Sequence, residues 1–396
     1  FSAGVMVTAS HNPPNDNGYK VYLGGDFGGS QIIAPIDSEI ESAILSAASR
    51  FTFDSLPKTQ PETVGGQELR NAYLESTRKL TGGHHFGKDL KVVYSAMHGV
   101  GLETLTGLLE SVGGPKLIHV TEQVLPDAGF PTTPFPNPEE PGAMDLSFAK
   151  AESVNADLII ATDPDADRLA IGLRGDHGFY RLTGDEVGLL LADELTGRPG
   201  ASGVLANSIV SSSALTRVAS VHGLTYEQTL TGFKWIMQVP GLLFGYEEAL
   251  GYACDPSHTP DKDGISAALV ALTIADRLHQ NGVTLAEHLA EIKRRYGYRP
   301  TAQVSVRVEN KAQVSAILES LTANPPKEIQ GRSLTVTDLS KPTGNLPATS
   351  GLKLTLENGD WVILRPSGTE PKFKAYLETS EENLESLKTE VKKLLS

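Results

Sequence analysis

The chain of 396 residues is too long for one ordinary domain, so we expect two to four. A formal net charge of −14 at pH 7 argues against nucleic acid and anionic membranes as partners, and the longest apolar runs fall short of the roughly 18 residues that a membrane helix needs. The single cysteine, Cys254, excludes a disulfide framework within the chain and favours a cytoplasmic location.

The first predicted element is an apolar strand, residues 4–7, that gives way to the sequence Ala-Ser-His-Asn-Pro-Pro. Residues before proline are pushed out of the helical region, and asparagine and proline both favour turns. Ser10 therefore stands where a strand ends and a stiff loop begins. A serine hydroxyl is a poor nucleophile without a base or a metal, and no G-x-S-x-G elbow surrounds this one. Ser10 is either a turn residue or, with a metal nearby, a carrier of phosphate.

Residues 90 to 223 alternate short β-branched runs with amphipathic helical patterns. Strands are expected at 90–96, 156–162 and 203–209. These runs are apolar throughout, as parallel strands are when both faces of their sheet are covered. The proline-dense segment 123–145 is expected to be an ordered surface loop. The pattern predicts successive parallel α/β layers.

Beyond about residue 300 the predicted strands alternate polar and apolar residues. They lie at 302–308, 333–339, 352–358 and 361–366, mixed with helices at 311–321 and 381–395. This region is expected to be a smaller α+β domain.

Three carboxylates at alternating positions follow the apolar run at 156–162: Asp163, Asp165 and Asp167. Carboxylates this close repel one another unless a cation lies among them, and ligands collect at the carboxyl ends of strands in α/β sheets. A few oxygen ligands suit Mg²⁺. A calcium EF-hand is excluded because Arg168 and Arg174 stand where that loop needs glycine and glutamate. The remaining alternative is an acidic surface turn.

The segment from Arg365 to Lys372, RPSGTEPK, follows the predicted strand at 361–366. Ser367, Gly368 and Thr369 offer successive backbone N–H groups and two hydroxyls, and the arginine and lysine add charge. This pattern is typical of an anion-binding loop, although it is not a Walker A sequence. A polar turn is the alternative.

Three further segments contain candidate binding or catalytic residues, but each is a weak signal of such a site when taken alone. Paired glutamates can bind sugar hydroxyls or act as acid and base, but most such pairs are solvated. The residues concerned are Glu247 and Glu248, then Thr231, Gly232 and Lys234, and finally Lys262.

Taken together, the motifs resemble the α-D-phosphohexomutase family, which contains phosphoglucomutases and phosphomannomutases. TASHNP is similar to its phosphoserine loop, DPDADR to its magnesium loop, GYEEALG to its sugar-binding loop and RPSGTEPK to its phosphate loop. They occur in the family order. The sequences SHNPPNDNGYKVY, TGFKWI and DKDGISAA look closest to the bacterial phosphoglucomutase branch related to phosphopentomutase-like enzymes.

The resemblance implies three successive mixed-sheet α/β domains and a C-terminal α+β domain around a central cleft. We expect domain 1 at 1–80, domain 2 at 81–180, domain 3 at 181–298 and domain 4 at 299–396. The chain begins at Phe1, inside a predicted strand, and lacks the family's G-x-R-G element, so the first domain is expected to be truncated at its N-terminus.

The resemblance also implies a phosphoserine mechanism with Mg²⁺ and with glucose 1,6-bisphosphate as intermediate and activator. Ser10 carries the phosphate, His11 supports its loop and Lys20 assists proton transfer. Mg²⁺ is held by Ser10 and the three aspartates. Substrate binding falls to Arg168, Thr231, Gly232, Lys234, Glu247, Glu248, Lys262, Arg365, Ser367, Gly368, Thr369 and Lys372.

The expected reaction is reversible phosphoryl transfer between O1 and O6 of glucose, by a cytoplasmic monomer or homodimer whose partner is a small phosphosugar. Ala249 departs from the serine that other branches carry in the sugar loop, so a phosphopentomutase or phosphomannomutase remains an alternative. More distant alternatives are a magnesium phosphatase, a non-catalytic sugar-phosphate binding protein and an inactive fragment.

Overall fold

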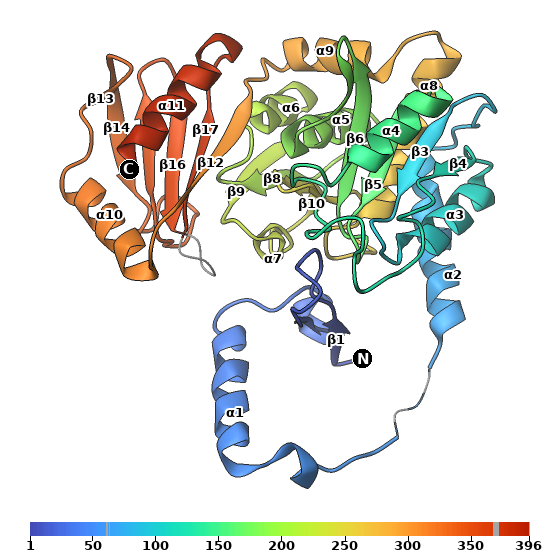
Figure 1. Ribbon diagram of the computed structural model, residues 1–396, viewed down its shortest axis with the longest axis horizontal. Coiled ribbons are helices and arrows are strands. Elements are labelled where there is room, and N and C mark those ends of the chain that lie inside the picture. Colours follow the sequence, from blue (N-terminus) through green and yellow to red (C-terminus); the bar gives the residue numbers. More distant parts are fainter. Residues whose placement is uncertain (61, 63, 367–371, 396) are drawn as a thin grey trace.

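The structure is a computed structural model that describes residues 1–60, 62, 64–366 and 372–395 (Figure 1). Ser367, Gly368 and Thr369, which the sequence predicts to bind phosphate, lie outside the described residues. The strands form four sheets that follow one another along the chain, with two, five, four and six strands. We name them by these strand numbers.

The two-stranded sheet pairs β1 (Ala3–Val7) with β2 (Tyr19–Leu23) in an antiparallel hairpin. The predicted change from strand to loop before Ser10 is confirmed, because β1 ends at Val7. The short helices η1 (Gly25–Phe27) and η2 (Phe53–Ser55) flank α1 (Ile36–Arg50). This segment lies below the rest of the molecule in Figure 1, and its hairpin loop reaches up toward the larger sheets.

The five-stranded sheet has the order β4-β3-β5-β6-β7. The strand β3 is parallel to its neighbours β4 and β5, whereas β6 and β7 continue antiparallel, so the sheet is mixed. β3 and β5 are buried along their whole length, which explains why their sequences are apolar throughout. The elements are α2 (Gly66–Thr77), η3 (Arg78–Thr81), β3 (Val92–Ser95), α3 (Gly101–Val112), β4 (Leu117–His119), α4 (Asp145–Val154), β5 (Leu158–Thr162), β6 (Leu169–Gly175) and β7 (Gly178–Arg181).

The four-stranded sheet has the order β11-β10-β8-β9 and is also mixed, because only β11 is antiparallel to its neighbour. Thr183 and Thr284 begin α5 and α9 with capping boxes, and the Asp263 side chain caps α8. The elements are α5 (Gly184–Thr196), β8 (Val204–Ser208), α6 (Ala214–His222), β9 (Thr225–Thr229), α7 (Phe233–Ile236), β10 (Leu242–Glu247), β11 (Gly251–Ala253), α8 (Gly264–Gln280) and α9 (Leu285–Arg295).

The six-stranded sheet has the order β12-β17-β16-β15-β14-β13, with every neighbouring pair antiparallel. β15 alternates buried and half-buried residues, as the sequence predicts, whereas β16 is buried at four consecutive residues from Trp361 to Leu364. The α+β prediction for this part is confirmed. The elements are β12 (Thr301–Arg307), α10 (Lys311–Ala323), β13 (Glu328–Ile329), β14 (Arg332–Asp338), β15 (Leu352–Leu356), β16 (Trp361–Pro366), β17 (Lys372–Glu378), η4 (Glu381–Asn383) and α11 (Leu384–Leu394).

One continuous core joins the five-stranded and four-stranded sheets, and the six-stranded sheet has a core of its own. The helix α8 is buried from Gly264 to Asp276 and packs against elements of both central sheets. It therefore fixes the loops of one sheet relative to those of the other. In the described part of the chain, the length and apolar character needed to cross a bilayer do not occur together in any helix.

Candidate active site

The loop between β1 and β2 places Ser10 against the loop between β5 and β6. The Ser10 Oγ lies 3.2 Å from Asp163 Oδ2 and 3.3 Å from Asp165 Oδ1, across more than 150 residues of sequence. Ser10 has a positive φ of 54°, which is uncommon for a residue with a side chain. Thr8 holds this conformation, because its hydroxyl accepts from the Ser10 N–H and donates to Asp165.

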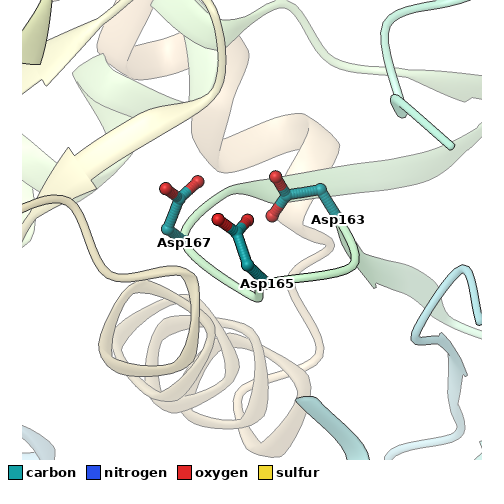
Figure 2. Close-up of side chains that lie close together, drawn as sticks. All are labelled: Asp163, Asp165 and Asp167. Atoms are coloured by element: carbon teal, nitrogen blue, oxygen red, sulfur yellow. The ribbon is translucent and has the colours of Figure 1, made fainter. Parts of the chain in front are cut away.

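The three aspartates come from the turn that joins β5 to β6, and Figure 2 shows their carboxylates gathered on one side of this turn. One oxygen of each lies within 4.8 Å of the others. Burial, reinforced by the charges of Asp167 and Asp165, raises the pKa of Asp163 above its ordinary value. The buried Asp167 Oδ1 has no hydrogen-bond partner among the described residues. Three hard oxygen donors with an unsatisfied buried atom fit a divalent metal ion.

Three cationic side chains surround the aspartates, and one of them, Arg168, has its Nε atom 3.9 Å from Asp163 Oδ2. Lys20, on β2, lies 3.1 Å from Asp165 and 2.5 Å from Asp167, and Lys262 lies 3.3 Å from Asp167. Burial alone would raise the pKa of Asp167, but Lys262 and Lys20 hold it below its ordinary value. Burial also opposes the charge on Lys20, yet Asp167 and Asp165 raise its pKa overall. Lys20 is therefore protonated in this arrangement.

His11 also contacts the Ser10 hydroxyl, with its Nδ1 atom 3.0 Å from Oγ. Burial, together with the charges of Arg168 and Lys262, lowers the pKa of His11 to about 3. The imidazole is therefore neutral at pH 7 and is able to exchange a proton with Ser10.

Two glycines let the backbone pack closely against the aspartate loop. A Cβ atom at Gly99 would lie 2.2 Å from the Cα of Pro164, and one at Gly264 would lie 2.3 Å from the carbonyl oxygen of Arg168. The next residue after Gly99, Val100, donates its N–H to the Pro164 carbonyl, and the Gly264 N–H donates to that of Ala166. The loop is thus held from both sides by backbone that carries no side chain.

A cavity of about 1070 Å³ opens beside Ser10 and reaches across to the six-stranded sheet. Its lining includes four predicted site residues, which are His11, Arg168, Glu248 and Lys372. The lining also includes residues from all four sheet regions, so the expected central cleft is present.

The two glutamates of the sugar-loop motif face different neighbours. Glu247 lies at the end of β10, 3.8 Å from Lys262, and is buried beside the aspartate cluster. Glu248 lines the cavity and accepts hydrogen bonds from Ser208 and Ser211. Burial raises the pKa of both carboxyls.

The remaining predicted residues lie apart from the Ser10 contacts. Arg365 Nη1 donates to the Thr231 hydroxyl, so Arg365 lies against the turn before α7. Gly232, with a φ of 104°, is the residue that begins this turn of helix. Lys234 pairs with Asp37 of α1 at 3.3 Å.

Sequence reasoning missed several residues of the cavity wall. Glu139, from the proline-dense segment, lies 3.3 Å from Arg168, and burial raises its pKa. Arg181, Arg307 and Lys374 add positive charge to the wall. The adjacent pair Glu139 and Glu140 in the proline-dense segment is the only local signal for this site residue. No residue near it in the sequence indicates that Glu139 pairs with Arg168.

Asp185, at the start of α5, is a buried carboxyl in the cavity wall. It accepts hydrogen bonds from Ser212 N–H at 2.6 Å, Tyr246 Oη at 2.9 Å and Thr301 Oγ1 at 2.6 Å. Burial outweighs these donors and raises the pKa of Asp185 from 3.8 to about 7. A raised pKa means that the folded chain binds the proton more tightly than the unfolded chain does.

We therefore expect Asp185 to make stability decrease as the pH rises from about 4 through about 7, by up to about 4 kcal/mol. In Asp185→Asn, the midpoint of thermal unfolding, measured by circular dichroism, should depend less on pH between pH 5 and pH 8 than it does in the parent. Asp54→Asn, at a carboxylate whose side chain is 92% exposed, is the control and should follow the parent profile. Parallel profiles for the parent and Asp185→Asn would contradict this assignment.

The chain matches four sequence profiles of one family, in order. They are described as phosphoglucomutase/phosphomannomutase, alpha/beta/alpha domain I (residues 1–51), domain II (71–175) and domain III (183–296), and the C-terminal domain (304–394).

Individual proteins agree with these profiles. A probable phosphomannomutase of Haemophilus influenzae is 45% identical over 95% of this chain and 77% of its own length. A human phosphopentomutase is 35% identical over 100% of this chain and 71% of its own length. The crystal structure of the phosphoglucomutase parafusin from Paramecium shares the fold, with a TM-score of 0.72 at 20% identity over 99% of this chain and 77% of that one. The chain belongs to the phosphoglucomutase/phosphomannomutase family, with its three α/β/α domains and C-terminal domain.

Proposed function

We propose that this protein is a phosphosugar mutase that moves a phosphoryl group between O1 and O6 of glucose through a phosphoserine at Ser10. The observation that carries the proposal is the position of the Ser10 hydroxyl, 3.2 and 3.3 Å from two carboxylates of the aspartate cluster. A hydroxyl beside a metal-binding cluster, at the edge of a large cavity, is arranged for phosphoryl transfer rather than for packing.

In the first half-reaction the free hydroxyl of a bound sugar monophosphate attacks the phosphorus of phosphorylated Ser10. The bond from phosphorus to Ser10 Oγ breaks, a bond to the sugar oxygen forms, and the hydroxyl proton ends on Oγ. Neutral His11, 3.0 Å from Oγ, is placed to handle the proton at that atom. Lys20 is proposed to assist proton transfer, as the resemblance implies, and its raised pKa keeps it protonated.

The aspartate cluster is proposed to hold Mg²⁺ through Asp163, Asp165, Asp167 and the oxygen of Ser10. When bound there, Mg²⁺ is a Lewis acid that offsets negative charge on the transferring group. Lys20 and Lys262 neutralise the same carboxylates in this structure, so the chain's own cations share this task.

The bisphosphate formed in this way, glucose 1,6-bisphosphate, then turns over in the cavity, and its second phosphate passes to Ser10. A volume of about 1070 Å³ is slightly larger than ordinary ligand sites and leaves room for this movement. We propose that the phosphate distant from Ser10 is bound by Arg365, Ser367, Gly368, Thr369 and Lys372. We propose that the sugar is bound by Arg168, Thr231, Gly232, Lys234, Glu247, Glu248 and Lys262.

Domain boundaries near residues 80, 180 and 298 are part of the proposal and assign one motif to each domain. A cytoplasmic location, a monomeric or homodimeric state and independence from nucleic acid and membranes are proposed from composition alone.

Glucose is proposed because the segments around Ser10, at 231–236 and at 261–268 resemble the phosphoglucomutase branch. Mannose is the second candidate, because the relative with 45% identity is named a probable phosphomannomutase. Ribose is the third, because the human relative is named a phosphopentomutase.

We expect the value of kcat/KM, measured as isomer exchange, to be highest for glucose 1-phosphate among the 1-phosphates of glucose, mannose and ribose. The loss of a single contact in such a site lowers kcat/KM by roughly 10-fold to 200-fold, so a preference for one sugar should be measurable. A preference for mannose or ribose would overturn the substrate, and release of inorganic phosphate without isomer exchange would overturn the mutase itself.

A further inference from the structure

Four serines, three of them buried, gather in a turn that no motif of the sequence indicates. The turn begins at Ser208, the last residue of β8, and runs to Ser213, and we call it the serine turn. Ser208, Ser211 and Ser212 are at most 2% exposed. Buried polar groups need hydrogen-bond partners, and the hydroxyls and one backbone N–H of the serine turn donate to three carboxylates from three different elements. These are Glu248 after β10, Asp185 at the start of α5 and Glu378 at the end of β17.

On the cavity side, the serine turn holds Glu248 by its side chain and by its backbone. Ser208 Oγ and Ser211 Oγ donate to Glu248 Oε2 at 2.9 and 3.0 Å, and the Glu248 N–H donates to Ser211 Oγ at 3.1 Å. Two hydroxyls on one carboxylate oxygen fix the direction of that carboxylate. Ser211 thus orients the turn between β10 and β11, where Glu248 and Ala249 form part of the cavity wall.

On the opposite side, the serine turn is bound by the six-stranded sheet. Glu378, 1% exposed, accepts from Ser212 Oγ at 3.0 Å and from the Ser213 N–H at 2.8 Å through Oε2. Its Oε1 accepts from Ser213 Oγ at 2.6 Å. A buried carboxylate with three donors is a strong and directional contact. The sheet is therefore attached to the serine turn at this residue.

A second contact lies beside the first, on the neighbouring strand. Thr301 is the cross-strand partner of Glu378, and its hydroxyl donates to Asp185, which also accepts the Ser212 N–H. The ends of β12 and β17 are thus both attached around Ser212. The other end of β17 begins at Lys372 in the cavity wall, so one strand joins the attachment point to the cationic side of the cavity.

We propose that the serine turn is a positioning element, which transmits the docking of the six-stranded sheet at Glu378 to the orientation of Glu248 in the cavity. Ser211 and Glu378 are positioning residues for the reaction, since both act through Glu248. The inference rests on the proposed function, because it assigns Glu248 a task in binding the phosphosugar.

The test compares Ser211→Thr with Ser211→Val, two side chains of nearly the same shape of which only the first keeps the hydroxyl. We expect kcat/KM for isomer exchange to decrease about 10-fold to 100-fold in Ser211→Val. Ser211→Thr should recover most of this loss because it keeps the hydroxyl. Any crowding by the added methyl group is the same in both variants. A role in packing alone would affect the two variants equally.

A second comparison asks whether the effect passes through Glu248. In a Glu248→Gln background, adding Ser211→Val should change kcat/KM by less than about 3-fold, because the partner of the hydroxyl has already been altered. Glu378→Gln should lower kcat/KM in the otherwise native chain and should likewise have little further effect with Glu248→Gln. Glu382→Gln, at an exposed carboxylate near the end of the same strand, is the matched control for Glu378→Gln.

Ser213→Ala is a milder variant that removes one hydroxyl while leaving the backbone N–H contact to Glu378, and it serves if Glu378→Gln does not fold. Equal activities of Ser211→Thr and Ser211→Val, or full effects that persist with Glu248→Gln, would overturn the inference while leaving the mutase intact. Absence of isomer exchange in the native chain would overturn the proposed function, and the inference with it.

Discussion

Ser10→Ala is expected to abolish isomer exchange, with a decrease in kcat of at least about a thousandfold. The reason is that the hydroxyl is both the acceptor and the donor of the phosphoryl group, and no neighbouring side chain replaces it. Thr8 is the nearest hydroxyl in the loop, but its oxygen is already engaged with the Ser10 N–H and Asp165. Exchange between glucose 1-phosphate and glucose 6-phosphate measures the loss.

The same variant gives a second, independent measurement. Intact-mass analysis after incubation with glucose 1,6-bisphosphate should show one added phosphoryl group on the native chain and none on Ser10→Ala. Ser257→Ala, at an exposed serine that donates to Asp255, is the control and should accept the phosphoryl group as the native chain does. Phosphorylation of Ser10→Ala at the native level would show that another residue carries the phosphate.

Asp165→Asn is expected to weaken Mg²⁺ binding by at least about 100-fold and to lower kcat by a similar factor, because it removes one of the charged oxygen ligands. Asp165 is also the carboxylate that both Thr8 and Lys20 contact, so the Ser10 loop loses part of its support. Isothermal calorimetry with Mg²⁺ measures the binding change, and isomer exchange at saturating Mg²⁺ measures how much activity the metal restores.

Glu122→Gln is the control for loss of a negative charge, since Glu122 is exposed and follows β4 of the same sheet. It should leave Mg²⁺ affinity unchanged. Mg²⁺ affinity of Asp165→Asn equal to that of the native chain would remove the aspartate cluster from the proposed mechanism.

Sequence reasoning identified the aspartate turn and the Ser10 loop, because their chemistry is local. Asp163, Asp165 and Asp167 lie within five residues, directly after a strand whose apolar sequence reveals its burial. The meeting of Ser10 with this turn was expected from the resemblance to a family rather than from the spacing of residues. The structure places the two loops in contact through hydrogen bonds from Ser10 to Asp163 and Asp165.

The serine turn and Glu139 escaped prediction because their partners are distant in sequence. Glu378 lies 165 residues from Ser213, and Glu139, in the proline-dense segment, lies 29 residues from Arg168. A serine in a turn has the same local pattern whether it faces water or a buried carboxylate. Only the packing of one sheet on another decides whether such a serine faces water or a buried carboxylate. The loop residues 367–369 lie outside the described chain, so their predicted role stays a prediction.

The close approach of backbone at Gly99 and Gly264 has a consequence for how the protein tolerates change. Any methyl group at either place would push the neighbouring chain outward, and the three acidic side chains would move apart with it. Ion affinity would then suffer from substitutions that never touch the ion. At these two positions the functional property is the lack of a side chain, so even alanine, the smallest replacement, is expected to be harmful there.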